Sequence, residues 1–209
     1  MIKIPLTIAI LLLACITAVA QQPADSAARR FQAGLDAQKA GQYEQALREY
    51  ATALQLDPKY YFAQFNSASC YAELQRWPEA IAAFQAAIAL RPNEAVTYVG
   101  LASIYARMDR TNEAIDALKQ ALRLNPKVPL ARRALADCYA RLNQHDDAIR
   151  ILSEAAQLTR DDPDILRDLA GQYVNAGSFQ PAVELINRVI ALQPNQLTTT
   201  SLSALLMNE

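Results

Sequence analysis

The stretch "EAVTYVGLASIYARMDRTNEAIDALKQALRLNP", from Glu94 to Pro126, decides the fold because it contains two amphipathic segments joined by a polar turn. Apolar residues recur three and four positions apart in residues 98–106 and again in 114–122, which is the spacing of one helix face. The residues between them, "MDRTN", are typical of a short turn, and Pro126 stops the second helix. The stretch therefore predicts a helix–turn–helix unit.

This unit recurs every 34 residues along the chain. We call residues at this interval a column. The clearest columns hold alanine (Ala46, Ala80, Ala114, Ala148, Ala182), a small residue (Gly34, Ala68, Ala102, Ala136, Ala170), tyrosine (Tyr71, Tyr105, Tyr139, Tyr173), leucine (Leu56, Leu90, Leu124, Leu158, Leu192) and proline (Pro58, Pro92, Pro126, Pro194). Where Arg160 interrupts the proline column, Pro163 follows three residues later. Such a period indicates stacked units that bury one continuous core, with tyrosines and leucines filling the space between the small residues.

The turns inside the units begin at residues that favour the end of a helix. They begin at Gly41, Gln75, Asp109, Asn143 and Gly177. Gly, Asn and Asp tolerate the left-handed backbone that ends a helix, whereas Gln75 does so less well. We expect the left-handed conformation at these positions.

The small-residue, tyrosine, alanine and proline columns together resemble the tetratricopeptide repeat, over about Ala27 to Asn195. The first unit departs from the pattern, since Ala37 stands where later units carry tyrosine. The resemblance implies an all-α fold, a right-handed α-solenoid of five 34-residue units. The periodicity continues into residues 197–209, where we expect a C-terminal closing helix.

The first twenty residues, "MIKIPLTIAILLLACITAVA", predict an export signal. One lysine precedes an apolar run, and Ala18 and Ala20 provide the small residues that flank a cleavage point. We therefore divide the chain into a signal peptide (1–20), a polar lead-in (21–26), five repeats (27–196) and the closing helix (197–209). The expected location is periplasmic or secreted.

Two alternatives concern the same segment. "LLAC", ending at Cys15, resembles the bacterial lipoprotein signal, in which this cysteine is lipidated and anchors the protein to the outer membrane. The apolar run could instead be retained as a membrane anchor, although it is short for a span of about 20 residues.

Composition argues against several classes of function. The formal net charge is −1 and no basic stripe appears, so nucleic-acid binding is not expected. No Cys, His, Asp or Glu cluster has metal-ligand spacing, and the only histidine, His145, falls in a packing column. We therefore expect no catalysis, no metal and no cofactor.

Cys70 and Cys138 occupy the same column two units apart. Because packed helices lie 8–10 Å apart, equivalent sites two units away are separated by roughly 20 Å. A disulfide needs Cα atoms within about 7 Å. We expect two separate buried thiols.

The resemblance places a partner-binding groove on the first helix of each unit, at its second, fifth, sixth, ninth and twelfth positions. These positions are apolar or aromatic in the first three units and carry charges of both signs in the last two. The expected groove residues are Phe31, Leu35, Phe62, Phe65, Asn66, Val96, Val99, Arg133, Asp137 and Arg167. The lysine and asparagine clamp of chaperone-binding relatives is absent, with only Asn66 matching it.

These features predict an exported scaffold that binds a peptide or helix of a partner protein. One alternative is an outer-membrane lipoprotein that assists assembly of pili or membrane proteins. Another is a structural protein that self-associates through Leu202, Leu205 and Leu206 of the closing helix.

Overall fold

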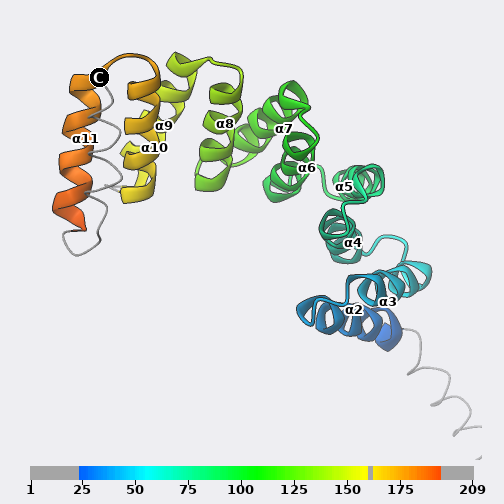
Figure 1. The fold of residues 1–209 in the computed structure, drawn as a ribbon. Helices are drawn as coiled ribbons and strands as arrows, with labels where there is room; N and C mark the ends of the chain where they lie inside the picture. The colour runs from blue at the N-terminus through cyan, green and yellow to red at the C-terminus, as the bar shows by residue number, and fades with distance from the viewer. Residues whose placement is uncertain (1–23, 160–161, 194–209) are drawn as a thin grey trace, which may run out of the picture. The chain divides into compact units, whose positions relative to one another are not determined.

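A computed structural model describes residues 24–159 and 162–193, which form ten helices and no strand (Figure 1). The helices are α2 (Ala24–Lys39), α3 (Tyr43–Leu56), α4 (Tyr61–Glu73), α5 (Trp77–Leu90), α6 (Ala95–Arg107), α7 (Thr111–Leu124), α8 (Pro129–Arg141), α9 (His145–Thr159), α10 (Pro163–Asn175) and α11 (Phe179–Leu192). The predicted all-α repeat solenoid is confirmed.

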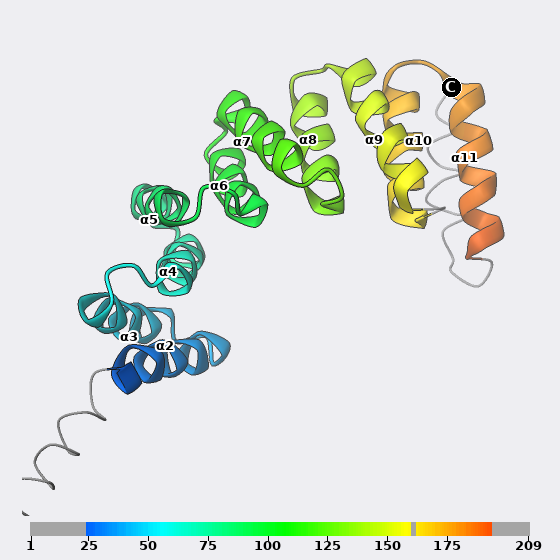
Figure 2. The same cartoon turned by 180° about the vertical axis from the view of Figure 1, so that it is seen from behind.

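The chain divides into two compact units, residues 1–92 and 93–209. The first unit contains the helix pairs α2–α3 and α4–α5, and the second contains α6–α7, α8–α9 and α10–α11. Within each pair the two helices lie side by side in both views (Figures 1 and 2). The predicted closing helix and the predicted signal peptide lie outside the described residues.

The turns within the helix pairs have the backbone that their residues predict. Gly41 and Gly177 have φ angles of 73° and 72°, and Gln75, Asp109 and Asn143 each have a φ of 58°. In each of these turns the next residue donates its N–H to a carbonyl in the last turn of the preceding helix, as Arg76 does to Tyr71 at 2.8 Å. The left-handed conformation is confirmed at all five positions, including Gln75.

The small residues of the repeat lie where paired helices approach most closely. Ala46, Ala80 and Ala114 are completely buried. Gly34 shows the reason most clearly, because a methyl group placed on it would lie 2.4 Å from Cε1 of Tyr50. Tyr50 is itself completely buried and donates its hydroxyl to Gln38 at 2.6 Å. The first repeat thus pairs its largest core residue with its smallest.

The tyrosine column is only partly core. Tyr139 is buried, but Tyr71 and Tyr105 are half-buried at the edge of the core. The guanidinium of Arg76 lies 4.8 Å from the ring of Tyr71, and that of Arg110 lies 4.6 Å from the ring of Tyr105. Each arginine directly precedes the second helix of its pair, so it covers the tyrosine ring from the turn.

The leucine column is not uniformly buried, and the prediction that its members fill the core is wrong for three of them. Leu56 is 50% exposed, Leu158 54% and Leu192 45%. Each is the last or next-to-last residue of its helix. A helix end is covered on fewer sides than its middle, so a periodic apolar position there stays in contact with solvent.

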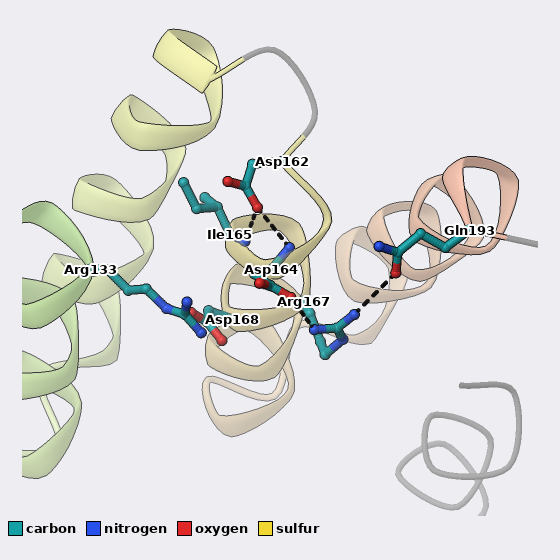
Figure 3. Close-up of polar contacts among 7 residues, drawn as sticks. All are labelled: Arg133, Asp162, Asp164, Ile165, Arg167, Asp168 and Gln193. Atoms are coloured by element: carbon teal, nitrogen blue, oxygen red, sulfur yellow. Dashed lines mark hydrogen bonds and ion pairs between the residues drawn. The ribbon is translucent and has the colours of Figure 1, made fainter. Parts of the chain in front are cut away.

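The break in the proline column marks the start of a helix. α9 ends at Thr159, and Pro163 occupies the first position of α10. Asp162 caps this helix, because its carboxylate accepts the backbone N–H of Asp164 at 2.9 Å and of Ile165 at 3.4 Å (Figure 3). Proline suits the first helical position because the N–H it lacks would have no partner within the helix.

Both described cysteines are free thiols within the core, as predicted. Cys70 is completely inaccessible to solvent and Cys138 is 3% exposed. Burial, with a smaller contribution from Glu73, raises the pKa of Cys70 to about 12. Burial also raises the pKa of Cys138.

No helix of the described residues is long and apolar enough to cross a membrane.

Candidate functional site

The first unit presents aromatic rings on the neighbouring helices α2 and α4. The ring of Phe31 lies 6.4 Å from that of Phe62 and 5.1 Å from that of Tyr60, measured between centroids. Phe62 is 48% exposed, whereas Phe31 and Tyr60 are half-buried, and Phe31 also contacts Tyr50. We call Phe31, Tyr60 and Phe62 the aromatic surface. Of these three rings, that of Phe62 is the most accessible to solvent.

Arg91 lies over the rings beside this surface. Its guanidinium carbon is 4.9 Å from the centroid of Phe62 and 4.6 Å from that of Tyr61. Arg91 directly follows α5, so a reading of first-helix positions alone does not find it. An arginine over an aromatic face is attracted by the ring electrons, and it holds the Phe62 ring in place.

The other predicted groove residues of the first unit have internal contacts. Phe65 is half-buried, and its ring lies 5.6 Å from that of the buried Phe84. Leu35 is half-buried against the core. The amide of Asn66 donates to the carbonyl of Phe62 at 2.8 Å. Among the predicted residues of this unit, Phe62 therefore has the largest accessible apolar surface.

In the second unit the apolar first-helix positions lie on α6 and at Leu130 of α8, which is 70% exposed. Val96 is 53% exposed, whereas Val99 is half-buried and packs against the core. The structure thus leaves one predicted valine accessible.

Charged side chains occupy several of the other first-helix positions on α8 and α10. The guanidinium of Arg133 forms an ion pair with the carboxylate of Asp168 in the following repeat (Figure 3). Asp137 is exposed, and its side chain makes no hydrogen bond or ion pair within residues 24–159 and 162–193. Partial burial of its carboxyl, and then the negative charge of Asp168, raise the pKa of Asp137. A positively charged group of a partner would relieve that repulsion.

Arg167 is held by two neighbours. It donates to the carboxylate of Asp164 at 2.6 Å and to the side-chain carbonyl of Gln193 at 3.5 Å (Figure 3). Since both predicted arginines of this region are paired, the face is a network of compensated charges and offers no free basic stripe.

Arg141 has a structural role that the repeat pattern did not reveal. Its guanidinium donates to the carbonyl of Ala106 at 2.8 Å and pairs with the carboxylate of Asp109. It therefore ties α8 to the turn of the preceding repeat. The sequence contained a signal, namely an arginine at the end of a helix close to an earlier Asp turn.

No group of three or more His, Cys, Asp or Glu that could hold a metal occurs in the part of the chain that the structure describes. His145 is the first residue of α9. Its ring contacts the side-chain carbonyl of Gln172 in α10, with Nδ1 and Oε1 3.1 Å apart. The histidine thus links two adjacent helices, in keeping with its packing column.

Comparison with known families decides the identity of the repeat. Models described as tetratricopeptide repeat match residues 60–127, 105–165 and 143–205. The chain belongs to the tetratricopeptide repeat family. Members of this family are generally non-enzymatic scaffolds for protein–protein interaction, and they bind proteins or peptides.

Solved structures share the fold of this tetratricopeptide repeat chain. MamA is 21% identical with a TM-score of 0.74, covering 82% of this chain and 93% of its own. YrrB, described as a tetratricopeptide repeat protein with an unusual peptide-binding site, is 18% identical with a TM-score of 0.70, covering 90% and 97%. PilF of Pseudomonas aeruginosa is 19% identical with a TM-score of 0.71, covering 86% and 81%. At these identities the likeness concerns the fold alone. The comparison with curated protein sequences found no significant match.

Proposed function

We propose that this protein is an exported scaffold that binds a peptide or helix of a partner through the first-helix faces of its repeats. The observation that carries the proposal is Phe62, which is 48% exposed beside Phe31 and Tyr60. Exposed aromatic residues are the usual anchors of protein interfaces because they bury a large area with few rotatable bonds. The peptide-binding site named for YrrB supports the same use of the fold.

The partner would present apolar side chains to the aromatic surface. A partner's positive charge would suit Asp137 of the second unit, whose ionised form is disfavoured. Apolar anchors supply most of the affinity, and complementary charges orient the partner.

Crosslinking tests this proposal at the predicted anchor. A photoreactive phenylalanine analogue at position 62 should crosslink one partner from the exported fraction, and Phe62→Ser should abolish its capture. Phe179→Ser is the matched control, because Phe179 is 45% exposed but begins a second helix. Equal capture by the two serine variants would refute binding at the aromatic surface.

Export is the second part of the proposal, and the apolar segment 1–20 supports it. The mass of the mature N-terminus distinguishes the forms. A chain beginning at Gln21 supports a soluble exported scaffold, whereas an acylated Cys15 supports the outer-membrane assembly factor. An intact N-terminus in the cytosolic fraction would contradict export.

Self-association remains an alternative use of the fold. Its predicted residues, Leu202, Leu205 and Leu206, lie outside the described residues. Sedimentation of a chain that ends at Gln196 tests it, since an oligomer that depends on these leucines would dissociate.

A further inference from the structure

A cavity of about 290 Å³ lies between α8 and α9 in the second unit, away from the first-helix residues discussed above. It is lined by Lys127, Arg132, Ala155, Leu158 and Thr159. Among these described residues, two side chains are cationic, one carries a hydroxyl and two are apolar. The volume is at the small end for ligand pockets and suits a group of a few carbon atoms.

The column of Arg132 holds polar residues in the first two repeats, Arg30 and Gln64, and less polar ones in the two repeats that flank it. One repeat earlier the column holds Tyr98, which packs against the core, and one repeat later it holds Leu166, which is 1% exposed. The side chain of Arg132 is only 12% exposed. A largely buried cation is unfavourable unless its N–H groups are hydrogen-bonded or paired.

The hydrogen bonds of Arg132 are incomplete. Its Nη1 donates to the carbonyl of Pro126, which fixes the plane of the guanidinium. Its Nε is buried and makes no hydrogen bond. The carboxylate oxygen Oε2 of Glu154 lies 3.9 Å from Nε, close enough for an ion pair but too far for a hydrogen bond, and Glu154 also pairs with Arg150 at 3.5 Å.

We propose that this cavity binds a carboxylate attached to a short apolar group. With Nη1 engaged, Nε and Nη2 form the remaining side of the guanidinium, and two such N–H groups bind a carboxylate through both oxygens. Lys127 adds a second positive charge, and Ala155 and Leu158 contact the apolar part. A monoanion fits better than a phosphate dianion because much of the wall is apolar.

Such a carboxylate occurs in small free acids and at the C-terminus of a peptide. Titration of the full chain with butyrate, followed by backbone NMR shifts of Lys127 and Thr159, tests the first source. The dipeptide acetyl-Ala-Val with a free carboxylate, compared with its amide, tests the second. Binding of either carboxylate supports the site, and binding of the dipeptide alone assigns it to peptide C-termini.

Arg132→Leu, which introduces the residue found at position 166, should raise the dissociation constant at least tenfold. Arg30→Leu is the matched control, since Arg30 is in the same column three repeats earlier and its side chain is 51% exposed. Should Arg132→Leu fail to fold, Lys127→Glu on the exposed loop should weaken binding severalfold without loss of helicity.

Three results would overturn the proposal. The first is equal binding of butylamine, or of the dipeptide amide, since neither presents a carboxylate. The second is unchanged affinity in both Arg132→Leu and Lys127→Glu. The third is binding of inorganic phosphate with none of butyrate or of the dipeptide acid.

Discussion

The two units of this protein use the same repeat to display different chemistry on their first helices. In the first unit α2 and α4 expose aromatic rings, with Phe62 the most accessible. In the second unit α8 and α10 carry Arg133, Asp137 and Asp168, of which Arg133 and Asp168 form an ion pair while the pKa of Asp137 is raised. The fold requires neither set, because the alanine and small-residue columns already supply the close helix contacts. The contrast teaches that the solenoid leaves these faces free to vary.

The cores of the two units differ as their surfaces do, with aromatic residues in the first unit and aliphatic ones in the second. The column that faces the small residues holds Tyr50 and Phe84 in the first unit but Leu118, Leu152 and Ile186 in the second. The aromatic residues of the first unit therefore continue from its surface into its core. The following predictions test this difference, from the largest expected effect to the smallest.

The largest expected effect is the suppressed reactivity of the Cys70 thiol. Because burial raises the pKa of Cys70 to about 12, its thiolate fraction at pH 8 should be ~10³-fold below that of an ordinary cysteine. In a Cys15→Ser background, Ellman's reagent should label Cys70 and Cys138 only as each unit opens locally. Their separate rates compare the two units. Labelling at the rate of a free thiol in the native protein, equal to that in guanidinium chloride, would contradict the burial.

Core truncation should come next. Phe84→Ala should lower the free energy of unfolding by about 3–5 kcal/mol, and Leu118→Ala, in the same column of the second unit, by about 2–5 kcal/mol. Trp77 is the only tryptophan and lies in the first unit, so its fluorescence reports that unit, whereas circular dichroism reports both. Phe84→Ala should shift the Trp77 transition further than Leu118→Ala does. The reverse order would show that the aromatic core is not what stabilises the first unit.

A pair of glycine substitutions should give effects of opposite sign. Gly34→Ala should cost about 1–3 kcal/mol because the new methyl group would clash with the ring of Tyr50. Gly171→Ala in α10 should stabilise by about 0.5–1 kcal/mol, since nothing lies within 4 Å of the new atom and alanine favours a helix. Thermal denaturation of both variants measures the difference. A stabilised Gly34→Ala would mean that Tyr50 can move aside at little cost.

The smallest effect should come from Asp137. Because its pKa is raised in the folded protein, its ionisation lowers stability as the pH rises above the ordinary value near 3.9. Asp137→Asn should therefore be more stable than the parent by about 0.3 kcal/mol at pH 7, a small value because the residue is exposed and screened. The gain should disappear at pH 3. The exposed Asp116→Asn serves as the control, and a gain that persists at pH 3 would exclude the carboxylate charge as its cause.

Much of the site geometry depended on side-chain length and direction, which a repeat column does not encode. The column placed Phe62 and Phe65 on the same face, yet Phe65 turns toward Phe84 while Phe62 stays half-exposed. The sequence placed charges of both signs on α8 and α10 but did not pair Arg133 with Asp168 across repeats. It did not reveal Arg91, which reaches the aromatic surface from the end of another helix.

The sequence by itself determined the helical repeat, the five turns and the burial of Cys70 and Cys138. Each of these follows from local rules: helix periodicity, the backbone preference of a turn residue, and spacing within a repeated unit. Only the tertiary structure decided which periodic residues are accessible, since Leu56 and Leu158 keep the repeat yet remain half-exposed. It alone showed that Nε of Arg132 is buried beside a cavity and makes no hydrogen bond. Burial depends on what neighbouring helices cover, and that is a property of the packed units.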